Sequence, residues 1–330
     1  MRCPILKDLP PPPPGKTGWP WTEETSPLPD KMTDARLWPG LSIVTPSLNQ
    51  GQFIEETIRS VLLQGYPALE YMIIDGGSND ETSEIIKKYE KWLAYWVSEP
   101  DRGQSHAINK GVLHAAGDIV SWLNSDDLYC KRAFETAVLA MCPQETAMHP
   151  IVYGNALRID EMSNVTGEFI SSKAEWITYR NLVALRHSLG IHQPSVFLAS
   201  SLMRQYPLDE NLKYVMDYDL WIRLSRDHAF HHVPDFLSLI RFHHSSKSSI
   251  NIKQGRGLFI RETLFVSRRY WNHQPFNRMY FRLHSAAWAL RKRVLAITEV
   301  TLIRLKSVLV SILGEIAYTT LKNRIRCLRP

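Results

Sequence analysis

The stretch Ile119-Val120-Ser121-Trp122-Leu123-Asn124-Ser125-Asp126-Asp127 runs from an apolar segment into a turn with two adjacent carboxylates. The apolar segment is typical of a short buried strand. Neighbouring carboxylates repel each other unless a cation or hydrogen bonds hold them, and oxygen-only ligation suits Mg²⁺ or Mn²⁺. The pattern therefore predicts a divalent-cation site at a strand end. The alternative is that Asp126 or Asp127 caps the next helix, near Lys131.

The residues before this stretch repeat a unit of strand, polar turn and helix. Leu41 to Val44 and Tyr71 to Ile74 are short β-rich runs, and each leads through a polar turn into a helical pattern. A third strand is predicted over 94–97 and a third helix over 105–116. Strands that alternate with helices predict an α/β fold with a mostly parallel sheet and flanking helices, whose ligands bind at the carboxyl ends of the strands.

The amino-acid composition and the secondary-structure pattern change twice along the chain, which predicts three parts. Residues 1–40 are rich in proline and predict an extended arm, in which Trp19 and Trp21 can be buried against a domain. Residues 41–250 hold the strand–helix units and then a mixed region, with strands near 151–157, 195–198 and 236–241 and a helix near 217–226. Residues 251–330 are helical in pattern and basic. With 330 residues and 44% apolar composition, the chain is a folded protein rather than a peptide or a disordered, collagenous or coiled-coil chain.

The charge is divided unevenly along the chain. From Ile252 on, 16 Lys and Arg stand against three Glu, a net charge of +13, whereas the residues before it carry −7. The basic extension allows three interpretations. Nucleic-acid binding is disfavoured because no recognised module is present. A membrane-surface helix suits Lys and Arg on one face with apolar residues on another, and packing on the domain or on a second subunit is the alternative.

Cysteine usage and the N-terminus favour a cytoplasmic protein. The four cysteines lie far apart and form no CxxC pair, which indicates neither a disulfide framework nor a zinc site. The N-terminal residues lack the apolar core of a signal peptide, and no stretch is long and apolar enough to cross a membrane. We expect a cytoplasmic location, with peripheral attachment at the inner face of the plasma membrane if the extension binds lipid.

The familiar phosphate-binding loops are missing from the sequence. No GxGxxG follows the first strand and no GxxxxGK[ST] occurs, which disfavours dinucleotide dehydrogenases and P-loop enzymes. A nucleotidyltransferase would need a glycine-rich basic loop after the first strand, but residues 45–51 contain one glycine and no Lys or Arg. Asp75-Gly76-Gly77 at the second strand end offers a carboxylate and a close backbone turn to a nucleoside, or is a plain turn.

Several motifs in this order resemble the nucleotide-sugar-binding half of the family 2 glycosyltransferases, whose fold is the GT-A type. They are Thr45-Pro46-Ser47-Leu48-Asn49, the strand-end Asp75, Glu99-Pro100-Asp101-Arg102-Gly103-Gln104, Ala107-Ile108-Asn109-Lys110-Gly111, Asn124-Ser125-Asp126-Asp127 and Met216-Asp217-Tyr218-Asp219-Leu220-Trp221-Ile222-Arg223. The resemblance covers roughly residues 41–250. It implies a nucleotide-binding half over 41–128 and an acceptor half over 129–250.

The resemblance also implies roles for single residues. The nucleotide would contact Pro46, Asn49, Asp75, Gln104 and Asp126. Asp126 and Asp127 would form the family's DXD-type motif and bind Mn²⁺ or Mg²⁺, but Asn124 stands where the motif usually begins with Asp, so either acid could be the direct ligand. On the acceptor or diphosphate side, the resemblance points to His192, Gln193, Arg241, His243 and Lys247. A structural histidine and a solvated loop are the alternatives there.

Asp217 matches the acid that ends the family's Glu-Asp motif, although Met216 replaces the Glu. We expect Asp217 to be the catalytic base, because a sugar hydroxyl is a poor nucleophile until a carboxylate takes its proton. A helix-capping role is compatible with that function. A single displacement at the anomeric carbon would invert it.

The resemblance therefore predicts an inverting, metal-dependent glycosyltransferase of the hexosyltransferase type. The donor would be a nucleoside diphosphate sugar, with a UDP-sugar as the first candidate, and the acceptor a glycan or lipid-linked molecule in polysaccharide or envelope glycan synthesis. No nucleic acid is expected as a partner. The alternative is a non-catalytic sugar-nucleotide or glycan binding protein on the same fold, which Asn124 and Met216 would suit.

Overall fold

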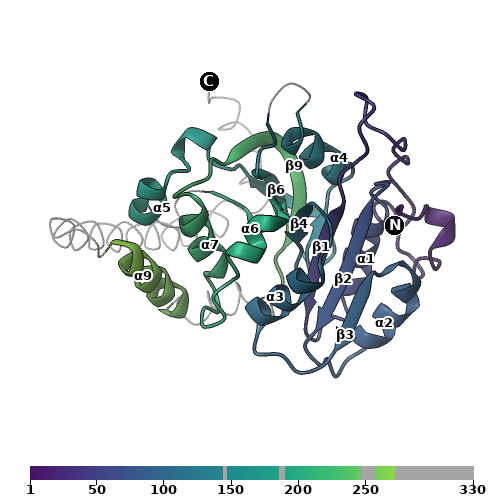
Figure 1. The fold of residues 1–330 in the computed structure, drawn as a ribbon. Coiled ribbons are helices and arrows are strands. Elements are labelled where there is room, and N and C mark those ends of the chain that lie inside the picture. The colour runs from purple at the N-terminus through teal and green to yellow at the C-terminus, as the bar shows by residue number, and fades with distance from the viewer. Residues whose placement is uncertain (144–146, 186–189, 245, 247–256, 272–330) are drawn as a thin grey trace, which may run out of the picture. The chain divides into compact units, whose positions relative to one another are not determined.

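A computed structural model describes residues 1–143, 147–185, 190–244, 246 and 257–271 (Figure 1). The chain divides into a compact unit, Met1–Ser267, and a second unit, Arg268–Pro330. The predicted boundary at 250 falls outside the described residues, and the first unit continues beyond it into helix α9 (Gly257–Trp271). None of the helices within the described ranges is long and apolar enough to span a bilayer.

The first half of the sheet is parallel, as predicted. Its strands are β1 (Leu41–Ser47), β2 (Leu69–Asp75), β3 (Tyr95–Ser98) and β4 (Ile119–Trp122), in the order β3-β2-β1-β4. The helices between them are α1 (Ile54–Leu62), α2 (Thr82–Tyr89) and α3 (Gln104–His114). Figure 1 shows α3 on one face of these strands and α1 and α2 on the other. Because the four strands are parallel, their carboxyl ends lie on the same side of the sheet.

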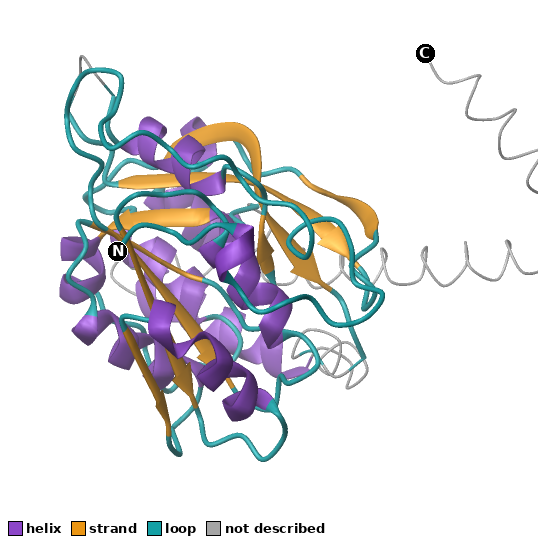
Figure 2. Cartoon of the chain, turned by 90° about the vertical axis from the view of Figure 1, so that its right-hand side faces the viewer, coloured by secondary structure: helices purple, strands orange, loops and turns teal. Residues whose placement is uncertain are grey.

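The second half of the sheet is mixed. It contains β5 (Leu128–Tyr129), β6 (Ile151–Ile159), β8 (Val196–Ala199) and β9 (His231–Arg241). Strand β8 pairs antiparallel with β4 and β6, β6 pairs parallel with β9, and β5 pairs antiparallel with β9. Strand β7 (Val165–Phe169) forms a hairpin with β6. In Figure 2 the strands of the two halves run in different directions, so the sheet curls.

The remaining helices surround the mixed half. They are α4 (Ala133–Met141), α5 (Tyr179–Leu185), α6 (Ser200–Gln205) and α7 (Met216–Leu224), with single 3-10 turns at Leu6–Asp8, Glu90–Trp92, Ala174–Trp176 and Gln193–Ser195. The predicted strands over 195–198 and 236–241 and the helix near 217–226 are confirmed with shifted ends. The pattern did not predict β7, an edge strand whose residues are mostly exposed. An exposed edge strand carries a weak apolar signal.

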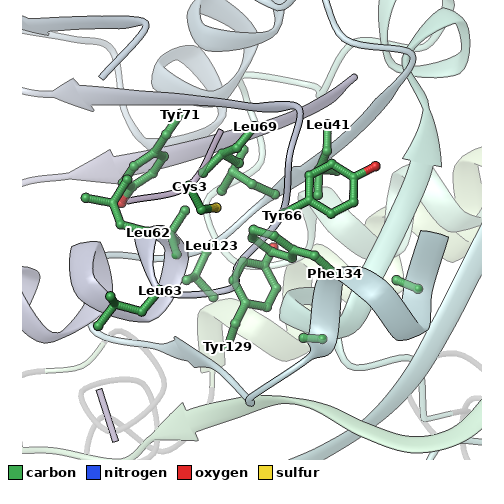
Figure 3. Close-up of a cluster of buried hydrophobic side chains, with 14 of the residues drawn as sticks. Cys3, Leu41, Leu62, Leu63, Tyr66, Leu69, Tyr71, Leu123, Tyr129 and Phe134 are labelled. Atoms are coloured by element: carbon green, nitrogen blue, oxygen red, sulfur yellow. The ribbon is translucent and has the colours of Figure 1, made fainter. Parts of the chain in front are cut away.

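Side chains alternate between the two faces of the sheet, so every second residue of a strand packs on the same face. Leu41 and Ile43 of β1 and Leu69, Tyr71 and Ile73 of β2 belong to one buried cluster with α1, α2 and α4. Figure 3 shows the centre of this cluster, where Cys3 from the N-terminal arm lies among the side chains of the sheet and α1. Burial of the thiol raises the pKa of Cys3 to about 12, which makes it an apolar core residue rather than a nucleophile.

The N-terminal arm packs along α1, with the buried tryptophan that the sequence predicts. Arg59 of α1 is fully buried, and its guanidinium donates hydrogen bonds to the carbonyl oxygens of Pro10, Pro20 and Trp21. The Trp21 ring lies over this guanidinium, and the Trp19 indole donates to the Tyr129 carbonyl. The arm is therefore part of the folded unit, and it satisfies a buried cation with its backbone.

Candidate active site

The two adjacent carboxylates at the end of β4 have different surroundings. The side chain of Asp126 is 20% exposed, whereas Asp127 is 3% exposed as a whole residue. Asp127 Oδ1 accepts a hydrogen bond from the Arg241 backbone N–H at 2.9 Å, and Oδ2 accepts from Asn124 Nδ2 at 3.0 Å. Burial and the neighbouring Asp126 charge raise the pKa of Asp127. Only Asp126 is left with a carboxylate oxygen, Oδ1, that accepts no hydrogen bond from a described residue.

The hydrogen bonds of Asn124 explain why an amide replaces the usual Asp at the start of the motif. Its Oδ1 accepts a hydrogen bond from Gln104 Nε2 at 2.6 Å, while its Nδ2 donates to Asp127. An aspartate at position 124 could not donate, and it would place a second negative charge against the buried Asp127. Gln104 is the first residue of α3, so the amide joins α3 to the loop. Neither Asp126 nor Asp127 caps α4, whose N-cap residue is Arg132.

The end of β9 holds this loop from the other side. Arg241 was expected near the diphosphate, but its side chain is fully buried and bonded within the protein. The guanidinium donates to the Asp126 carbonyl at 2.8 Å and forms an ion pair with Glu56 of α1 at 2.9 Å. Two residues later, His243 Nε2 forms a hydrogen bond with Asp126 Oδ2 at 2.9 Å. The Phe53 ring packs against both Arg241 and His243.

Asp217 lies in the first turn of α7. Its Oδ1 accepts a hydrogen bond from the Tyr218 backbone N–H at 2.8 Å, and the N-cap residue of the helix is Val215. Burial raises the pKa of Asp217 to about 6. A carboxyl group with this pKa is still largely ionised at neutral pH and is a stronger base than an ordinary aspartate.

Trp122 connects the predicted site segments. Its ring stacks on Trp221, one turn after Asp217 in α7, with ring centroids 5.9 Å apart. Its carbonyl accepts a hydrogen bond from Gln193 Nε2 at 2.7 Å, and two residues later the chain reaches Asn124. Gln193, α7 and the acidic loop therefore meet around one strand end. The indole nitrogens of Trp122 and Trp221 are buried and have no hydrogen-bond partner among the described residues.

His192 is half-buried. Its ring packs beside the Phe169 ring, and its Nε2 has no hydrogen-bond partner in the part of the chain that the structure describes. Burial lowers the pKa of His192 to about 4, so the ring is neutral at pH 7 and carries no charge for a phosphate. Lys247, the last residue expected on this side, lies outside the described residues.

The residues expected around the nucleoside differ in exposure. Pro46 is buried within β1, opposite Ile74, and Asn49 is exposed. Asn49 has a φ of 52°, and its Oδ1 accepts a hydrogen bond from the Asn79 N–H. Asp75 is 0% exposed, and its carboxylate accepts from the Ser78 N–H and from the hydroxyls of Ser78 and Ser98. Asp75 thus holds the loop after β2 and has no exposed surface to line a pocket.

Glu56 supports the site, although the sequence pattern alone did not indicate it. Glu56 is buried on α1, where it binds Arg241 and also accepts a hydrogen bond from the Ser163 hydroxyl in the β6–β7 turn. The available signal was a carboxylate at a position that the helical apolar pattern places near the buried face. Its partner could not be identified, because it lies 185 residues away.

Comparisons with known proteins identify the family of the chain. Residues 42–212 match the family described as Glycosyl transferase family 2. An uncharacterized glycosyltransferase of Rickettsia typhi is 30% identical over 220 residues, which cover 66% of this chain and 68% of that protein. One from Methanocaldococcus jannaschii is 26% identical over 251 residues, covering 74% and 84%.

Two solved structures share the fold. TarS 1-349 of S. aureus in complex with UDP-GlcNAc superposes with a TM-score of 0.55 at 16% identity, covering 76% of this chain and 71% of that one. The mannosyltransferase PcManGT from Pyrobaculum calidifontis, in complex with GDP-Man and Mn²⁺, superposes with a TM-score of 0.51 at 18% identity, covering 92% and 87%. The family match covers just over half of the chain and lies on a sheet of the GT-A type, and this chain is therefore a glycosyltransferase of family 2.

Proposed function

We propose that the protein moves a sugar from a nucleoside diphosphate sugar to an acceptor hydroxyl and inverts the anomeric carbon. The observation that carries the proposal is the Asp217 carboxyl, which has a raised pKa and lies in a helix that packs on the end of β4 through Trp221 and Trp122. In a single displacement, the acceptor oxygen attacks the anomeric carbon while Asp217 takes its proton, and the bond to the diphosphate breaks on the opposite side. The attack from behind inverts the configuration.

We assign the divalent cation, Mn²⁺ or Mg²⁺, to Asp126 rather than Asp127. Both oxygens of Asp127 accept hydrogen bonds from the protein, whereas His243 orients Asp126 through Oδ2 and leaves Oδ1 for a ligand. No group of three His, Cys, Asp or Glu suited to a metal occurs among the residues with described positions. One carboxylate fits a cation that completes its shell with water and substrate phosphates. When bound, it would neutralise charge on the departing diphosphate.

A UDP-sugar is our first candidate for the donor. TarS was solved with UDP-GlcNAc and PcManGT with GDP-Man, and both are nucleoside diphosphate sugars. We place the acceptor on the side of Gln193, which lies next to Trp122 and whose amide oxygen accepts no hydrogen bond from a described residue and could accept one from a sugar hydroxyl. We propose a glycan or lipid-linked acceptor in envelope or polysaccharide synthesis. Asn124 and Met216 suited the alternative of a non-catalytic binding protein. The structural role of Asn124 weakens that alternative.

The test of the catalytic proposal is Asp217→Asn. This variant keeps the size of the side chain and removes the base, so transfer to acceptors in an envelope glycan extract should fall at least about 100-fold. Stabilisation of the protein by UDP-sugars with Mn²⁺ in a thermal-shift assay should stay near the wild-type value. Full transfer activity in the variant would contradict the assignment. Asp219→Asn is not a suitable control, because Asp219 is buried in an ion pair with Arg223, whereas the exposed Asp227→Asn is.

A further inference from the structure

Three aromatic side chains from distant parts of the sequence lie side by side at the edge of the candidate site. Phe169 is the last residue of β7, His192 precedes the 3-10 turn at Gln193–Ser195, and Phe242 directly follows β9. The Phe169 ring centroid is 5.1 Å from that of His192 and 5.9 Å from that of Phe242. All three residues are half-buried, so these rings, the aromatic row, keep some exposed surface.

The Phe242 end of the aromatic row is fixed to the acidic loop. Phe242 lies between Arg241, whose N–H donates to Asp127, and His243, whose Nε2 forms a hydrogen bond with Asp126. The Phe242 N–H itself donates to the last carbonyl of β6 at 2.9 Å. This end of the row is therefore one residue away from each contact that holds the two acids.

The His192 end of the aromatic row is fixed to the end of β4. The next residue, Gln193, donates its amide N–H to the Trp122 carbonyl at 2.7 Å. The Trp122 ring stacks on Trp221 of α7, the helix that carries Asp217. The row therefore connects the surroundings of the candidate cation ligand with those of the proposed base.

The two described basic residues that were expected on this side do not suit a phosphate. Burial lowers the pKa of His192 to about 4, so its ring is neutral at pH 7. Arg241 has a fully buried side chain, and its guanidinium is paired with Glu56. Phosphate oxygens are bound through charge-assisted hydrogen bonds, whereas a neutral aromatic surface suits an apolar face of a ligand. These observations favour a neutral acceptor over a lipid phosphate.

We propose that the aromatic row binds a sugar ring of a glycan acceptor, an inference that rests on the proposed function. A pyranose ring has apolar faces formed by its C–H groups and carries hydroxyls at its rim. Aromatic rings contact such faces, and a few polar groups beside them fix the orientation of the ligand. Phe169, at the centre of the row, meets the C–H face, and the amide oxygen of Gln193 accepts a hydrogen bond from a rim hydroxyl. The acceptor is therefore a glycan.

The test measures sugar transfer by the full chain to two acceptor probes, with UDP-sugars as donors and Mn²⁺ present. One probe is the neutral oligosaccharides released from an envelope glycan extract, and the other is undecaprenyl phosphate in detergent micelles. The wild type should transfer sugar to the oligosaccharides. Phe169→Leu keeps an apolar side chain but removes the ring, so KM for the oligosaccharides should rise about tenfold, with kcat changed less than about twofold.

Phe169→Tyr separates ring stacking from a merely structural role. Tyrosine restores the flat ring, so KM should return to within about threefold of the wild-type value. The matched control is Phe265→Leu, which removes an exposed ring of α9 and should leave KM and kcat unchanged. Stabilisation by UDP with Mn²⁺ in a thermal-shift assay should be the same in every variant, because the row is assigned to the acceptor and not to the donor.

The outcomes separate the inference from the function beneath it. An unchanged KM in Phe169→Leu, or an equal rise of KM in Phe169→Tyr, overturns the role of the aromatic row. Transfer to undecaprenyl phosphate alone overturns the glycan acceptor. If UDP-sugars with Mn²⁺ stabilise the wild type but neither probe is glycosylated, the inference fails and donor binding stands. If no UDP-sugar stabilises the wild type or is turned over, the proposed function fails as well.

Discussion

Asp126 and Asp127, the neighbouring acids after β4, differ in function because their hydrogen-bond partners differ. Asp127 is fixed by the Arg241 N–H and the Asn124 amide, while Oδ1 of Asp126 accepts no hydrogen bond from the described residues. Burial of a carboxylate is tolerated when donors satisfy it. The pair in the sequence is thus one structural acid and one candidate cation ligand.

Substitution of each acid should therefore give different results. Asp126→Asn should remove the thermal stabilisation by Mn²⁺ with UDP and lower kcat/KM about 100-fold or more, with little change in unfolding by urea. Asp127→Asn turns an acceptor into a donor that faces the Asn124 amide or the Arg241 N–H, so it should lower the free energy of unfolding by about 1–3 kcal/mol. Equal loss of Mn²⁺ binding in both variants, with stability unchanged, would contradict this division.

The pH dependence of the reaction should reflect Asp217. A base acts in its ionised form, and burial raises the pKa of this group to about 6. The rate should therefore be constant above that pH and fall about tenfold per unit below it. The measurement is kcat/KM between pH 4.5 and 8, with folding monitored by circular dichroism at each pH. An acid limb centred near pH 4 would mean that Asp217 is not desolvated in the free enzyme.

At the scale of elements, the acidic loop is held by segments that are distant in the chain. Thr57 of α1 donates to the carbonyls of Ser125 and Asp127, and the end of β9 holds Asp126 and Asp127 through Arg241. Glu262 of α9 accepts hydrogen bonds from the Lys213 and Tyr214 N–H groups just before α7. Helices α1 and α9 thus support the two ends of the site.

The buried ion pair between Glu56 and Arg241 should be costly to break. Glu56→Gln leaves the Arg241 charge buried without its counter-ion, so we expect a loss of about 3–5 kcal/mol in the free energy of unfolding by urea. The matched control is Glu135→Gln, which removes the exposed pair with Arg132 and should cost about 0–1 kcal/mol. Similar small losses in both variants would show that the buried pair is not required to hold the loop.

At the scale of the whole molecule, the basic extension divides at α9. The first compact unit ends at Ser267, whose hydroxyl forms a hydrogen bond with the Tyr218 hydroxyl of α7, so residues 257–267 of α9 belong to the unit that holds the site. Residues 272–330 lie outside the described residues, and the helical pattern expected there is untested. Their sequence has eleven Lys and Arg against two Glu. A net charge of this sign attracts anionic lipid headgroups.

We expect this segment to bind membranes at their surface. The full chain should float with liposomes that contain phosphatidylserine, and a chain that ends at Trp271 should stay at the bottom of the gradient while retaining α9. Salt should weaken the flotation, because electrostatic attraction is screened. Flotation of neither chain, or of both alike, would favour the alternative that the segment packs on the domain or on a second subunit.

Much of this protein could be predicted from local pattern, because strand and helix periodicity and polar turns are properties of neighbouring residues. The succession of strands and helices from β1 to β4 along the chain, the polar groups at the strand ends and the place of Asp217 in α7 follow from that pattern. The partners of these groups did not follow, since a side chain's exposure depends on residues far along the chain. His243 meets Asp126 across 117 positions, and Asp75 is buried by its own loop. Folding alone decided which acids remained available to a ligand.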